Sequence, residues 1–143
     1  SNHALYLQKA GNTSVLAAAG ADIDGVEGIV LTELGFDYRN DGHCGAGAPR
    51  FNVYTTAGTY FFFGCVYGVH TPAPDDPVNW TRVRFGDADA FPADGITPFP
   101  GFGTVVVTGI EIVFDEGTEV GPGYALLDNI DINGRLIGKP GNA

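Results

Sequence analysis

The chain has 143 residues, a length typical of one compact domain, and 44% of them are hydrophobic, too many for a disordered chain. Seventeen acidic residues against seven basic ones give a formal charge of −10, which excludes the phosphate-neutralising surface of nucleic-acid binders and disfavours anionic membranes. We interpret residues 1–3 as the remnant of an expression tag and residues 4–143 as a single domain, with the native leader removed.

Short β-rich runs alternate with turns that contain many of the 22 glycines and 9 prolines. The alternation predicts an all-β fold, a single antiparallel β-sandwich of jelly-roll type with about eight strands. An immunoglobulin-like sandwich is the alternative, disfavoured because Trp80 follows both cysteines. The expected strands, with a short tail strand at the end, cover residues 4–9, 14–18, 28–39, 50–56, 59–66, 80–85, 104–114, 124–132 and 135–137.

The clearest local unit is a tight hairpin, in which Ala57-Gly58 joins residues 51–56 to residues 59–63. The only cysteines, Cys44 and Cys65, flank this hairpin in Gly-rich surroundings. We predict that they form a disulfide, the alternative being two reduced, buried thiols. A disulfide indicates an oxidising compartment, so we expect a secreted or extracellular protein.

Alternation along the strands predicts which side chains face outward. With Phe51, Val53, Val83 and Phe85 in the core, several arginines and aromatic residues point away from it. If these strands share one sheet, its outer face is polar, aromatic and rich in arginine. That face is the predicted ligand site, composed of Arg50, Asn52, Tyr54, Trp80 and Arg82, with Glu33 and Arg39 at its margin. The alternative is a solvated face on which such residues pair across strands.

Two connections are long enough to be functional, residues 67–79 and 86–103. Phe91, Phe99 and Phe102 in the second connection predict that it packs against the domain. If the strand face is structural, these loops are where we expect the site.

No catalytic signature is present. Outside the tag remnant Ser14 is the only serine, and the histidines lack the spacing of zinc ligands. Glu33, Asp37 and Glu111 could supply the carboxylate pair of a glycosidase, but salt bridges to the outward arginines are the better explanation. We therefore expect a protein that is not an enzyme.

Three acidic, Gly-containing turns offer hard oxygen ligands for a structural calcium ion: residues 22–27, 115–119 and 128–134. Asp128 and Asp131 in the last turn are the candidate ligands. Asp128 is in phase with Leu126, Ile130 and Ile132, so it points inward unless a bulge intervenes. A buried carboxylate needs a cation or several hydrogen-bond donors.

The segment Ala125-Leu126-Leu127-Asp128-Asn129-Ile130-Asp131-Ile132 resembles the final strand of galactose-binding-like and carbohydrate-binding jelly-roll modules. The resemblance implies a two-sheet sandwich, a structural calcium in many members, and sugar bound by an aromatic face or by edge loops. We therefore expect a non-catalytic binding module of a secreted or cell-surface bacterial protein, with a carbohydrate or cell-surface polymer as partner. The alternative is a structural or adhesive spacer module with no small ligand.

Overall fold

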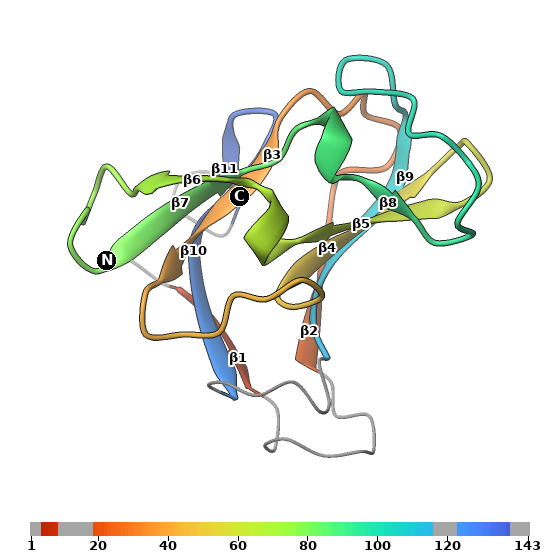
Figure 1. Cartoon of the computed structure of the whole chain (residues 1–143). Helices are drawn as coiled ribbons and strands as arrows, with labels where there is room; N and C mark the ends of the chain where they lie inside the picture. The colour runs from red at the N-terminus through yellow and green to blue at the C-terminus, as the bar shows by residue number, and fades with distance from the viewer. Residues whose placement is uncertain (1–3, 9–18, 116–122, 138–143) are drawn as a thin grey trace.

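The computed structural model describes residues 4–8, 19–115 and 123–137. In this part of the chain two antiparallel sheets pack face to face (Figure 1). The all-β class and the antiparallel β-sandwich predicted from the sequence are confirmed. The predicted strand at residues 14–18 and the tag remnant at residues 1–3 lie outside the described residues.

The first sheet has the order β1-β10-β3-β7-β6, with β11 added to β10. Its strands are β1 (Leu5–Gln8), β3 (Leu34–Arg39), β6 (Val69–Pro72), β7 (Trp80–Arg84), β10 (Tyr124–Ile132) and β11 (Arg135–Ile137).

The second sheet has the order β2-β9-β4-β5-β8. Its strands are β2 (Ala19–Ile23), β4 (Arg50–Thr55), β5 (Tyr60–Gly64), β8 (Phe91–Pro92) and β9 (Val107–Phe114). Two 3-10 turns, η1 (Cys65–Tyr67) and η2 (Asp87–Asp89), lie in the connections that follow β5 and β7.

Strand pairing is nested along the chain. β1 pairs with β10, β2 with β9, β3 with β7, and β4 with β5 through the predicted hairpin, whose Gly58 has φ 90°. Successive pairs therefore belong in turn to the first and to the second sheet, so that strands far apart in the sequence lie side by side. The double Greek key of a jelly roll has the same kind of arrangement. The jelly-roll type itself stays a prediction.

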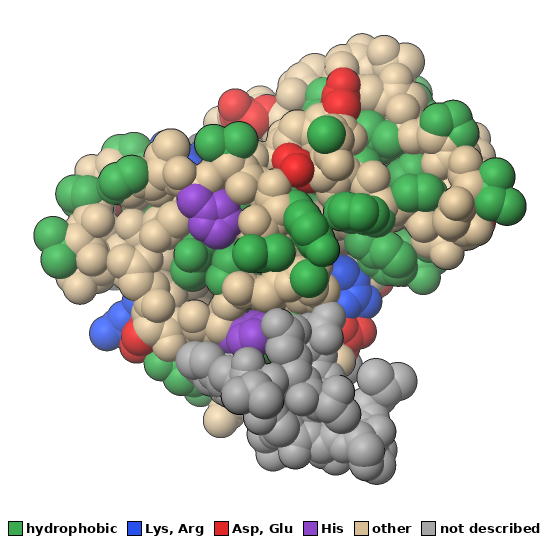
Figure 2. Space-filling model, in the orientation of Figure 1, with side chains coloured by type: hydrophobic (Ala, Val, Ile, Leu, Met, Phe, Trp, Pro, Cys, Tyr) green, Lys and Arg blue, Asp and Glu red, His purple; other side chains and the backbone are tan. Residues whose placement is uncertain are grey.

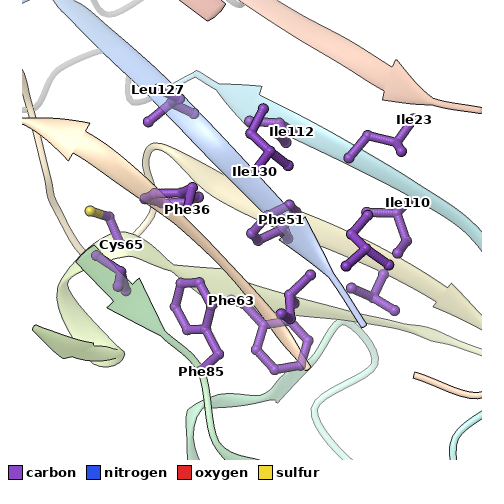
Figure 3. Close-up of a cluster of buried hydrophobic side chains, with 14 of the residues drawn as sticks. Ile23, Phe36, Phe51, Phe63, Cys65, Phe85, Ile110, Ile112, Leu127 and Ile130 are labelled. Atoms are coloured by element: carbon purple, nitrogen blue, oxygen red, sulfur yellow. The ribbon is translucent and has the colours of Figure 1, made fainter. Parts of the chain in front are cut away.

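The core lies between the sheets and is built around phenylalanine rings (Figure 3). Phe36 and Phe85 belong to the six-stranded side and contact Phe51, with ring centroids 5.5 and 6.0 Å away. Phe63 lies 5.6 Å from Phe85. These four rings are buried, as strand alternation predicts for Phe51 and Phe85. Edge-to-face contacts of this kind add to the free energy of burial.

Several predicted strand limits differ from the structure. The strand expected over residues 28–39 begins only at Leu34, because the backbone of residues 28–31 instead bonds to residues 105 and 107. The two long connections contain the short edge strands β6 and β8. The second connection does pack down, since Phe99 lies 5.1 Å from Phe61.

Asp128 does not follow the predicted inward phase. A bulge between Asp128 and Asp131, with Asn129 at φ 46°, shifts the alternation of β10 by one residue. Leu127 before the bulge and Ile130 after it therefore both enter the core. Asp128 is partly exposed on the outer side.

Candidate functional site

A row of five side chains crosses the outer face of the five-stranded sheet, one from each strand. Each faces the next directly across neighbouring strands, in the order Asp22, Glu111, Asn52, Phe62 and Phe91. Directly opposed residues share one face of a sheet. This outer face therefore changes from acidic at β2 to aromatic at β8.

The aromatic end of the row belongs to an aromatic strip of five residues, made of two groups of contacting rings that adjoin at Phe62 and Phe91. Centroid distances are 4.7 Å for Tyr54–Tyr60, 5.2 Å for Tyr60–Phe62 and 4.9 Å for Tyr67–Phe91. Phe62 and Phe91 are opposed across β5 and β8. Phe91 and Tyr67 are 44% and 45% exposed, which is high for large aromatic residues that contact each other. The strip consists of Tyr54, Tyr60, Phe62, Phe91 and Tyr67.

A cleft of about 450 Å³ lies at the β8 end of the strip, and we call it the Arg50 cleft. Its volume falls within the range of small-molecule binding sites. Figure 2 shows hydrophobic side chains gathered over β5 and β8 on this side of the molecule. The cleft is lined by Ala46, Gly47, Arg50, Phe62, Gly64, Tyr67 and Phe91.

Arg50 lies between the aromatic and the acidic parts of the face. Its guanidinium lies 5.1 Å from the Phe62 centroid, a cation–π contact. Nε donates to Asn52 Oδ1 at 2.8 Å, and Nη1 donates to the Gly47 carbonyl at 2.9 Å. Nη1 and Nη2 also donate to the two carboxylate oxygens of Asp115, the second at 3.0 Å. These contacts fix the guanidinium plane against the ring of Phe62.

Glu111 completes the polar part of the face. Its Oε1 accepts hydrogen bonds from Asn52 Nδ2 and from the Tyr54 hydroxyl, both at 2.8 Å. Partial burial, followed by the bond to Glu111, raises the pKa of Tyr54 to about 12. The phenol therefore stays protonated and donates at neutral pH. Arg50, Asn52, Glu111 and Tyr54 form one hydrogen-bonded chain along the face.

The wall of the cleft depends on a close backbone approach and on the disulfide. A Cβ built on Gly64 would lie 1.8 Å from the Ala46 carbonyl oxygen, so only glycine fits against this loop. The predicted disulfide between Cys44 and Cys65 is present, with Cα atoms 5.3 Å apart. It joins the loop that carries Ala46 and Gly47 to η1, which carries Tyr67.

The predicted site residues do not form one face. Arg50, Asn52 and Tyr54 lie on β4 of the five-stranded sheet, whereas Trp80 and Arg82 lie on β7 of the six-stranded sheet. The outer faces of a sandwich point in opposite directions, so a ligand on one does not touch the other. The predicted shared sheet is therefore wrong.

The remaining predicted residues also lie away from the Arg50 cleft. Arg39 is paired across strands with Trp80 and forms an exposed ion pair with Asp41, with Nε and Oδ1 3.2 Å apart. Glu33 precedes β3, where its backbone bonds to Asn133. Arg82 donates two hydrogen bonds to Asp37, as expected for an outward arginine with a carboxylate partner.

The two candidate calcium ligands have separate partners. Asp128 accepts a hydrogen bond from the Asn129 N–H at 2.8 Å. Asp131 accepts from the Gly134 N–H at 2.7 Å and lies 3.1 Å from Arg84 Nε. Within the described residues the one group of three close ligand atoms is Cys44, Cys65 and His70, and its two sulfurs form the disulfide. Calcium therefore stays a prediction.

Sequence reasoning missed four aromatic residues of the site: Tyr60, Phe62, Tyr67 and Phe91. Phe62 alternates with the buried Phe61 and Phe63, so strand phase alone could have placed it outward. Tyr67 and Phe91 lie in or beside the two long connections, which were the predicted alternative location. No local pattern indicates that these two rings meet.

The comparisons with protein-family models, with curated proteins and with solved structures returned no match to this chain. Among the described residues, no helix has the length and apolar character needed to cross a membrane.

Proposed function

We propose that the protein is a non-catalytic carbohydrate-binding module, with the Arg50 cleft and the aromatic strip as its site. The observation that carries this proposal is that two groups of contacting aromatic rings meet at one cleft, which Phe62, Tyr67 and Phe91 line together with the hydrogen-bonding side chain of Arg50. A scattered set of exposed aromatic residues would not support it.

Sugars combine two kinds of surface that this site can match. Their C–H faces stack on aromatic rings, and their hydroxyl groups need donors and acceptors fixed in position. Phe62, Phe91 and Tyr67 offer the rings. Arg50 and Asp115, held in one plane by two hydrogen bonds, offer a donor and acceptor pair next to them.

We also propose that the module works outside the cell, attached to or released from a bacterial surface. The Cys44–Cys65 disulfide supports this location, since disulfides persist in oxidising compartments. The net charge of −10 supports a neutral polymer as partner over nucleic acid or an anionic membrane.

A glycan array, run with calcium and with a chelator, is the direct test. Hits should be followed by titration calorimetry on Phe62→Ala and Tyr67→Ala. Each change should weaken binding about fivefold or more, since truncation of a buried aromatic contact costs over ~1 kcal/mol. Both rings are partly exposed in the free protein, so the melting temperature should stay within a few degrees.

Trp80→Ala is the matched control, because Trp80 is an aromatic residue on the outer face of the other sheet. It should leave binding unchanged. If Trp80→Ala abolishes binding while Phe62→Ala does not, the site lies on the six-stranded sheet and the proposal is wrong. If no glycan binds, the spacer module is the better account.

A further inference from the structure

We infer that the Arg50 cleft takes uncharged glycans and rejects those carrying carboxylate or sulfate groups, with Asp115 as the specificity-determining residue. The inference rests on the proposed carbohydrate function and names its ligand class. Among the residues that the structure describes, Arg50 is the only charged one that lines the cleft. An arginine beside aromatic rings would ordinarily indicate an acidic ligand. Whether the N–H donors of its guanidinium are free or already bonded to the protein therefore decides which class of glycan the cleft binds.

The guanidinium of Arg50 is already engaged by the protein. Arginine has five N–H donors. Nε–H bonds to Asn52, the two Nη1–H groups bond to Gly47 and Asp115, and one Nη2–H bonds to Asp115. Counting the bonds to described residues, one donor is left for a ligand. The Nη1/Nη2 edge of the guanidinium, which could bind a ligand carboxylate through two hydrogen bonds, is occupied by the carboxylate of Asp115.

The charges around this pair also oppose an anionic ligand. Asp22 and Glu111 face each other across β2 and β9 on the same outer face. Among the described residues, Arg50 is the only lysine or arginine on the strands of this sheet. Asp115 is paired with the one guanidinium, and Glu111 and Asp22 lie farther along the same face, so a further anion would meet net repulsion.

A neutral sugar needs no displacement of Asp115. One hydroxyl can accept a hydrogen bond from the remaining Nη2–H of Arg50, and a neighbouring hydroxyl of the same sugar can donate one to an oxygen of Asp115. The pair keeps its two hydrogen bonds, and the aromatic rings supply the stacking surface. The ion pair therefore serves as a polar anchor for hydroxyl groups.

The test is calorimetric titration with two oligosaccharides of equal length, one of neutral galactose and one of galacturonic acid. The wild-type protein should bind the neutral one more tightly. Asp115→Asn removes the competing carboxylate, and the uronate should then gain about tenfold or more, the effect of one charge-assisted hydrogen bond. Asp22→Asn is the matched control, because it removes a charge from the same face without releasing Arg50.

Tighter binding of the uronate by the wild-type protein overturns the inference and leaves the proposed function standing. So does an equal gain in Asp22→Asn and Asp115→Asn, which would show that total charge alone sets the preference. Absence of binding to either sugar, and to a wider set of neutral and acidic glycans, overturns the proposed function and this inference with it. The wild-type comparison holds even if Asp115→Asn is unstable.

Discussion

Arg82 on β7 donates two hydrogen bonds to the buried carboxylate of Asp37 on β3, at 2.8 and 3.1 Å. Asp37 also accepts a hydrogen bond from Asn129 at 2.9 Å, so three strands meet at this carboxylate. Without Arg82, Asp37 would be a buried charge with too few donors. The pair joins the central strands of the six-stranded sheet.

Arg82→Ala should therefore destabilise the protein by about 3 kcal/mol, the cost of removing one partner of a buried ion pair. Chemical denaturation monitored by circular dichroism measures it. Arg39→Ala is the control, because the Arg39–Asp41 pair is about half exposed and should contribute less than ~1 kcal/mol. Equal losses in the two variants would contradict the structural role of Arg82.

Asp131 should make the protein less stable as the pH rises, which is the opposite of the usual effect of a carboxylate. Burial, then the neighbouring Glu33, raises its pKa from 3.8 to about 6, although Arg84 opposes the shift. The folded state therefore holds the proton more tightly than the unfolded state. This contribution is fully present below pH 4 and is lost as the pH rises through about 6.

Denaturation of the wild-type protein and of Asp131→Asn between pH 4 and pH 7 measures this contribution. The stability of the wild-type protein relative to the variant should fall as the pH rises. A relative stability that increases over this interval would mean that Arg84 dominates and that the pKa of Asp131 is lowered.

Loss of the disulfide should affect both stability and binding. The cysteines are 21 residues apart, and a closed loop of this size contributes about 3 kcal/mol in the chain-entropy model. The double variant Cys44→Ser/Cys65→Ser should lose about that much and should bind glycans more weakly, because both walls of the Arg50 cleft are released. Mass analysis after alkylation tests the bond itself; two free thiols in the untreated protein would exclude it.

Gly64→Ala should disturb the Arg50 cleft and cost about 1–3 kcal/mol, since its Cβ would overlap the Ala46 carbonyl. Gly109→Ala is a matched control on the same outer face. There the nearest atom to an added Cβ belongs to Tyr54 and is 3.9 Å away. The melting temperature of Gly64→Ala should be clearly lower than that of Gly109→Ala. Equal melting temperatures would mean that the loop carrying Ala46 yields without cost.

The sequence predicted local features of this molecule well because they depend on neighbouring residues. Alternation placed Phe51 and Val53 in the core and turned Arg50, Asn52 and Tyr54 outward. The assignment of strands to sheets depends on pairings between distant segments, such as β3 with β7. That is why Trp80 was assigned to the wrong surface.

The bulge in β10 could not be predicted from the alternation of apolar residues either. One residue, Asn129, takes a left-handed conformation and reverses the phase of every residue after it. Asn is among the few residue types that tolerate this conformation, so its presence allows a bulge but does not predict one. The contact between Tyr67 and Phe91 likewise forms only when two long connections fold together.

Chemical-shift mapping by NMR tests the central claim most directly. A neutral oligosaccharide that the glycan array identifies would be added to protein labelled on its aromatic side chains. Binding at the proposed site should shift the ring signals of Phe62, Tyr67 and Phe91 and leave the indole N–H signal of Trp80 unchanged. A shift of the Trp80 indole with unchanged signals from those three rings would contradict the account.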